Sequence, residues 1–211
     1  IIEDQTLYWE WSLQFAYLPW SEIPNNILSE RMPGSFLFFE AIQWITNKNI
    51  FLILTIQAIV ASFTCVIISS CAYMINNRYG LYTGLFAAFS PLLIIISSQI
   101  LSDTIFLFAF VSSLFFILKY CYTSKKEYFI LLSGLFLGVT TFIRAATFPF
   151  IFLCLPIIYF MIKSKTNKSL PKVLILLFLF LCSALGPISP RLYDNIVNND
   201  SFVLTSQAGS H

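Results

Sequence analysis

The chain has 211 residues and a formal net charge of +2; 58% of its residues are hydrophobic and only 10% are charged. Its mean hydropathy is +0.81, and 23 of its residues are Phe. Soluble domains usually carry about 25% charged residues, so these values exclude a disordered chain, a nucleic-acid-binding domain and an ordinary cytosolic enzyme. They predict a protein whose main solvent is lipid.

Residues 1–48 precede the first long apolar segment and are rich in aromatic side chains, namely Tyr8, Trp9, Trp11, Phe15, Tyr17 and Trp20. Such residues are typical of helices that lie in the membrane interface. We interpret 1–48 as an extracytoplasmic loop with interfacial helices. An amphipathic anchor would explain the aromatics, but not the acids or the tight turn Glu30-Arg31-Met32-Pro33-Gly34. Because the chain starts with neither Met nor a signal sequence, we expect a longer parent protein.

Six apolar segments then approach the roughly 20 residues that a membrane helix needs. They cover 50–75, 81–98, 104–119, 128–143, 146–162 and 173–189. The Gly134-xxx-Gly138 spacing in the fourth segment indicates a close helix-packing face rather than a ligand site. We therefore predict an all-α, polytopic membrane bundle of about six spans over 49–189. The polar tail 190–211 would begin a further extracytoplasmic loop.

The basic residues predict the orientation of this bundle. If the loops alternate sides, one side holds eight of them: Arg78, Lys119, Lys125, Lys126, Lys163, Lys165, Lys168 and Lys172. The positive-inside rule makes that side cytoplasmic. Nine of the ten acids fall on the opposite side. Acids do not set topology, so their distribution favours a working face outside the cytoplasm.

Four charged residues lie at the predicted outer membrane boundary: Asp4, Arg31, Asp103 and Arg144. Between Asp103 and Arg144 the chain passes down one helix and back up the next, so both return to the same side. Ionisable groups at such depths usually have a function. Arg suits a phosphate group through two parallel hydrogen bonds, and a carboxylate beside it can remove a proton from an attacking acceptor.

Each of these residues also has a structural interpretation. Arg144 alone could be an anchor at a helix end whose charge reaches the headgroups. Asp103 could cap a helix together with Ser102. Arg31 and Glu30 could form a surface ion pair. The joint placement of the four residues is what favours a functional site.

Several ordered motifs resemble those of lipid-linked-sugar glycosyltransferases of the GT-C type. The motifs are Asp4 with Tyr8, Glu30-Arg31-Met32-Pro33-Gly34, Leu101-Ser102-Asp103-Thr104, Gly134-xxx-Gly138 leading to Phe142-Ile143-Arg144, and the tail from Asn199 to Gly209. The nearest branch is the dolichyl-phosphate-mannose–protein mannosyltransferase and aminoarabinose transferase group, a glycosyltransferase family 39-like group. The sequence departs from the family at Ser35-Phe36, where Tyr-Pro is usual, and at Ala145.

The resemblance implies transfer of a sugar, with inversion, from a polyprenyl-phosphate donor to a protein or glycolipid acceptor. Asp4 would activate the acceptor, and Asp103 would be the second catalytic acid. Arg31 and Arg144 would bind the donor phosphate, with Glu3, Tyr8 and Glu30 as further substrate-binding candidates. The chain would be an N-terminal fragment, inactive alone. We expect no metal or other cofactor, although paired carboxylates could hold a divalent cation.

Two other functions remain open from the residues alone: a transporter or flippase of a lipid-linked or small anionic solute, and a scaffold subunit. Transporters often place charge near the midplane within internal repeats, which this sequence lacks. The short loops favour a bacterial inner membrane over the endoplasmic reticulum. The five cysteines form no CxxC pair and are expected to be small core residues.

Overall fold

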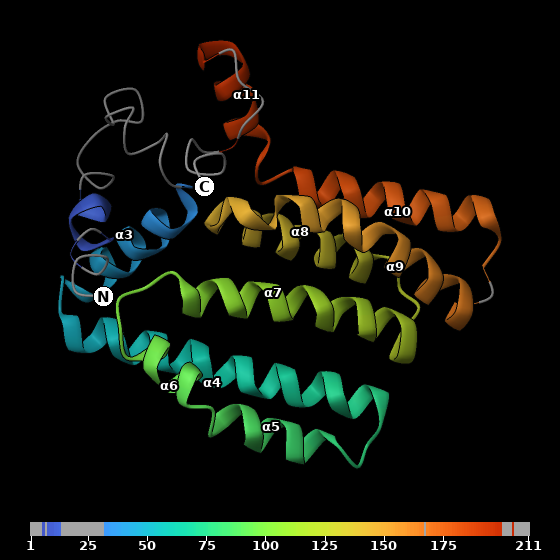
Figure 1. Ribbon diagram of the computed structural model, residues 1–211, viewed down its shortest axis with the longest axis horizontal. Helices are drawn as coiled ribbons and strands as arrows, with labels where there is room; N and C mark the ends of the chain where they lie inside the picture. The colour runs from blue at the N-terminus through green and yellow to red at the C-terminus, as the bar shows by residue number, and fades with distance from the viewer. Residues whose placement is uncertain (1–5, 7, 14–31, 167, 200–203, 205–211) are drawn as a thin grey trace.

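The computed structural model describes residues 6, 8–13, 32–166, 168–199 and 204, and every regular element in those ranges is a helix (Figure 1). This confirms the predicted all-α membrane bundle. Residues 8–13 are helical. The elements that follow are α3 (Gly34–Thr46), α4 (Ile50–Ile75), α5 (Gly80–Ala88), α6 (Pro91–Ser97), α7 (Asp103–Leu118), the π-helical turn η2 (Lys119–Thr123), α8 (Tyr128–Ile143), the 3-10 turn η3 (Ala145–Thr147), α9 (Phe148–Thr166), α10 (Leu170–Leu185) and α11 (Ser189–Asn199).

Each of the six predicted apolar segments is helical, and the segment 81–98 is divided between α5 and α6. Only some of these helices are long enough to cross a membrane. In the described part, three helices are long and apolar enough to cross a membrane: α4, α7 with η2, and α9 with η3. A fourth span results if α5 and α6, bent by 53° at their junction, are counted together. The bend follows from Pro91, which has no N–H and opens a new helix after Ser90. The helices α8 and α10 have 16 residues each. The bounds of α8 are those of the predicted segment 128–143, and both helices are shorter than the roughly 20 residues of a full membrane span.

The helices pack side by side, with α5 and α7 against α4, and α7 and α10 against α8. In Figure 1, α7 lies between α4 and α8, and α10 lies against the other side of α8. The short helices α3 and α11 lie at the end of the bundle where α7 begins and α8 ends (Figure 1). The division into an outer loop 1–48, a membrane bundle 49–189 and an outer tail 190–211 stays a prediction.

The contact between α8 and α10 confirms the predicted glycine packing face. A Cβ added at Gly134 would collide with Ser183 Oγ and the carbonyl of Phe180, and one at Gly138 would collide with the carbonyl of Ala184. Only glycine allows the two backbones to approach this closely.

The contact between α7 and α8 is fixed by two buried serines. Ser113 Oγ donates to the carbonyl oxygen of Ser133 at 2.9 Å, and Ser133 Oγ donates to that of Ser113 at 2.9 Å. Both side chains are shielded from solvent. In an apolar environment an unpaired hydroxyl is costly, so this reciprocal pair favours one register of the two helices.

Two expectations about individual segments were wrong. Residues 190–199 of the polar tail, whose asparagines are typical of turns, are instead helical and belong to α11; this helix buries the polar Arg191 and Asn195 and exposes Tyr193. Among the cysteines, Cys121 is buried as expected, but Cys182 is exposed on α10. Both errors arise because apolar composition does not say which face of a helix is covered.

Replacing Ser113 by Ala should lower the free energy of unfolding by about 1 kcal/mol more than replacing Ser112, because only Ser113 bonds to another helix. Ser112 is a matched control: it is equally buried on α7, and its hydroxyl donates to Phe108 in its own helix. Unfolding in mixed micelles with an increasing fraction of denaturing detergent measures the free energy of unfolding of both variants. Equal losses would show that the serine pair does not join α7 to α8.

Candidate active site

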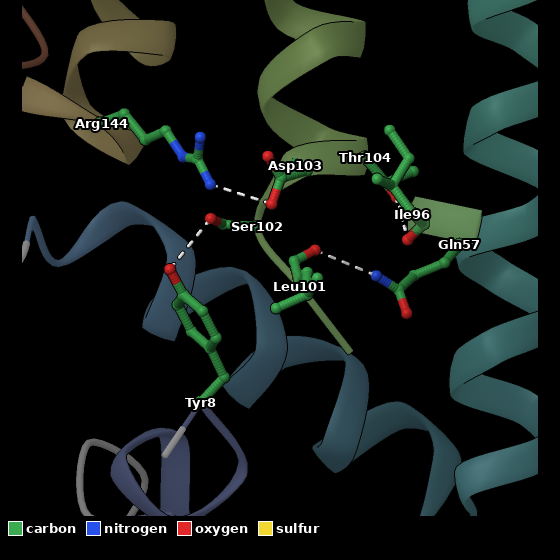
Figure 2. A network of polar contacts seen from close by, with 8 residues as sticks. All are labelled: Tyr8, Gln57, Ile96, Leu101, Ser102, Asp103, Thr104 and Arg144. Carbon is green, nitrogen blue, oxygen red and sulfur yellow. Dashed lines mark hydrogen bonds and ion pairs between the residues drawn. The ribbon is translucent and has the colours of Figure 1, made fainter. Parts of the chain in front are cut away.

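An ion pair joins the start of α7 to the end of α8. Arg144 Nη2 donates to Asp103 Oδ2 at 2.9 Å (Figure 2). Asp103 is the first residue of α7, and Arg144 follows the last residue of α8. Because the two helices run in opposite directions, these ends meet. The structure thus places Asp103 and Arg144 at the same end of the bundle, as the sequence predicts.

The two side chains are only partly covered, with exposed fractions of 42% for Arg144 and 29% for Asp103. The guanidinium carbon lies 5.3 Å from the centre of the Phe106 ring, so a carboxylate and an aromatic face restrain the cation together. A guanidinium has five N–H donors, and the contact with Asp103 uses one nitrogen. Within the described part of the chain the remaining donors have no other hydrogen bond, so they can serve an anion that approaches from solvent.

The interruption of the helix at Arg144, between α8 and η3, has a local cause. Arg144 has an extended backbone (φ −139°, ψ 113°), and Thr147 Oγ1 donates to its carbonyl oxygen at 3.0 Å. Pro149 then falls in the first turn of α9, where its missing N–H costs no helical hydrogen bond. The helix α8 therefore ends at Ile143, and the Arg144 side chain lies at the end of the bundle, partly exposed.

The segment before Asp103 is held by buried polar contacts. Gln57 Nε2, from a fully buried side chain of α4, donates to the carbonyl oxygen of Leu101 at 3.2 Å. Thr104 Oγ1 donates to the carbonyl oxygen of Ile96 at 3.1 Å. These contacts tie both sides of Asp103 to neighbouring helices (Figure 2).

The N-terminal helical residues lie against this segment. The hydroxyls of Tyr8 and Ser102 are 3.0 Å apart in a buried hydrogen bond (Figure 2). Tyr8 also packs with Phe36 and Phe39 of α3. Ser102 precedes α7, but its side chain makes no capping bond to that helix. Its hydroxyl instead joins the first segment of the chain to the start of α7.

The Met32-Pro33-Gly34 turn lies at the same end. Met32 is buried in the main core, and a Cβ at Gly34 would lie 2.6 Å from the carbonyl oxygen of Phe142, two residues before Arg144. Glycine is required here because backbone meets backbone. The described part of the Glu30-to-Gly34 motif therefore abuts the end of α8.

Of the residues expected at the site, the structure brings Asp103 and Arg144 into contact and places Tyr8 beside them. Tyr8 is buried, with an exposed fraction of 6%. Glu3, Asp4, Glu30 and Arg31 lie outside the described residues. Within the described ranges, no three His, Cys, Asp or Glu side chains converge as they would around a metal ion.

Two residues at this site were not expected from the sequence. Phe106 lies three residues after Asp103, on the same face of α7, a spacing that brings it to the ion pair. Gln57 is the only amide in the 26-residue apolar helix α4. The sequence could have predicted a role for Gln57, because an isolated amide in an apolar membrane helix is expected to form a hydrogen bond inside the bundle.

A comparison with protein families finds a match over most of this chain. The model of the family described as dolichyl-phosphate-mannose-protein mannosyltransferase matches residues 30–193, which include Asp103 and Arg144. No curated protein and no solved structure matches the chain. The match covers most of the chain and favours an enzyme over the transporter and scaffold alternatives. The chain belongs to the dolichyl-phosphate-mannose-protein mannosyltransferase family of membrane glycosyltransferases.

Proposed function

We propose that the protein transfers a hexosyl or pentosyl group from a polyprenyl-phosphate-linked donor to a protein or glycolipid acceptor. The observation that carries this proposal is the contact between Asp103 and Arg144 at one end of a membrane bundle of this family. A partly exposed guanidinium at that position suits the phosphate of a lipid whose chain lies in the membrane.

We place the reaction at the extracytoplasmic face, in a bacterial inner membrane. The other end of the bundle carries seven lysines in the segments 119–128 and 163–172, against one acid, Glu127. The positive-inside rule assigns that end to the cytoplasm and the Asp103–Arg144 end to the opposite side.

In the proposed reaction, an acceptor hydroxyl attacks C1 of the sugar from the face opposite the phosphate. The new bond from C1 to the acceptor oxygen forms as the bond from C1 to the phosphate oxygen breaks, which inverts the configuration. The polyprenyl phosphate leaves with the bonding electrons, and the acceptor proton passes to a carboxylate. Asp4 is our candidate for that base.

Arg144 and Arg31 would neutralise the negative charge that grows on the leaving phosphate. Asp103 already accepts a hydrogen bond from Arg144, which supports a role in holding the guanidinium for the donor. Tyr8 would position the N-terminal segment through Ser102. Glu3 and Glu30 remain candidates for binding the acceptor. We propose that these residues work without a metal or other cofactor.

Replacing Arg144 by Ala in the full-length protein should lower kcat/KM for the donor by about 10- to 100-fold, the value of a lost charge-assisted hydrogen bond. The KM for the donor should rise while the KM for the acceptor changes little. Arg78→Ala is the control, since Arg78 lies in the exposed turn between α4 and α5. Equal increases in both KM values would instead make Arg144 a structural anchor.

Replacing Asp4 by Asn should reduce sugar transfer by roughly 10²- to 10⁴-fold, because the amide cannot accept the acceptor's proton. Membrane insertion and donor binding should be unchanged. Glu10→Gln, which removes an exposed carboxylate in the helical residues 8–13, should keep the normal rate. A wild-type turnover number in Asp4→Asn would eliminate Asp4 as the base.

A further inference from the structure

The opposite end of the bundle carries a second charged region, which the proposed reaction does not use. We call it the lysine end: residues 119–128, after α7, and the described residues of 163–172, at the end of α9 and the start of α10. The α7–η2 and α9 helices are two of the candidate spans, and both finish here, at Thr123 and Thr166. Their ends lie where a membrane helix meets the lipid headgroups.

The turn η2 gives this region its shape. The N–H of Ser124 donates to the carbonyl oxygen of Lys119 at 2.8 Å, which closes a turn one residue wider than that of an α-helix. The wide turn buries Tyr120 and Cys121 and leaves Tyr122 41% exposed. Tyr122 and the exposed Tyr128 are the aromatic type that is enriched at membrane interfaces.

Aromatic rings hold three of the lysines beside this turn. Lys119 Nζ lies 5.3 Å from the ring centre of Phe115 and 5.1 Å from that of Phe129. Lys165 Nζ lies 4.8 Å from the ring centre of Tyr122, and Lys168 Nζ lies 5.5 Å from that of Tyr120. A ring face attracts an ammonium group but has no net charge, so these ring contacts do not neutralise the lysines.

Carboxylates neutralise little of this charge. Lys168 pairs with Glu127 at 2.9 Å, and within the described residues no other lysine of the lysine end forms an ion pair. Ammonium groups gathered at the edge of a low-dielectric bundle repel one another unless an anion lies between them. Phosphodiesters are the anions that a membrane supplies at this depth.

We propose that the lysine end binds an anionic phospholipid headgroup, with Lys119 and Lys165 as the residues that contact its phosphate. The acyl chains would lie along the apolar surfaces of α7 and α9. This site is separate from the proposed reaction, since it lies at the other end of the bundle and takes a lipid that is not consumed.

Native mass spectrometry of the full-length protein with phosphatidylglycerol tests the proposal. We expect Lys119→Gln with Lys165→Gln to weaken retention of this lipid on the order of 25-fold, from the free-energy contribution of two lysines at an anionic surface. The matched control is Lys125→Gln with Lys126→Gln, which removes the same charge from exposed lysines of the adjoining loop. Lys165→Gln alone should give an intermediate loss and changes only an exposed side chain.

Three results would overturn the proposal. Equal losses in the two double variants would show a diffuse charge effect without a site. Retention of phosphatidylcholine as strong as that of phosphatidylglycerol would show that the headgroup charge is not recognised. Displacement of phosphatidylglycerol by inorganic phosphate at millimolar concentration would show a site for free anions. Because none of these measurements uses sugar transfer, they stand apart from the test of the enzyme.

Discussion

The register between α7 and α8 is the constraint on which the rest of the structure depends. Ser113 lies ten residues after Asp103, and Ser133 lies eleven residues before Arg144. At 1.5 Å per residue these are nearly equal distances of about 15 and 17 Å along two antiparallel helices. The reciprocal serine hydrogen bonds therefore align the helices so that Asp103 meets Arg144 at 2.9 Å. A shift of one turn would move the two charges about 5 Å apart along the axis.

The same alignment gives the bundle two chemically different ends. At one end, the start of α7 and the end of α8 form the ion pair, and the N-terminal segment is joined to it through Tyr8 and Ser102. At the other end, η2 and the α9–α10 connection gather the lysines. The close contact at Gly134 packs α10 against α8, the helix that runs between the two ends.

The sequence predicted this arrangement unevenly. The positions of the helices and the common side of Asp103 and Arg144 follow from hydropathy and from the alternation of loops. The bounds of α8 agree with the predicted segment 128–143. The bend of 53° between α5 and α6 does not follow from hydropathy, because the whole segment 81–98 is apolar. The helix α11 was missed because it exposes Tyr193 and buries Arg191, which reverses the pattern expected in water. Phe106 and the wide turn η2 depend on packing between distant residues, which one sequence does not reveal.

We propose that Asp103 and Arg144 form part of one phosphate-binding site with Asp4 and Arg31. An experimental structure of the full-length protein with a polyprenyl monophosphate bound tests it most directly. We expect a phosphate oxygen within about 3 Å of an Arg144 nitrogen, with the Asp4 carboxylate at the same end of the bundle. A phosphate bound elsewhere, or Asp4 at the lysine end, would contradict it.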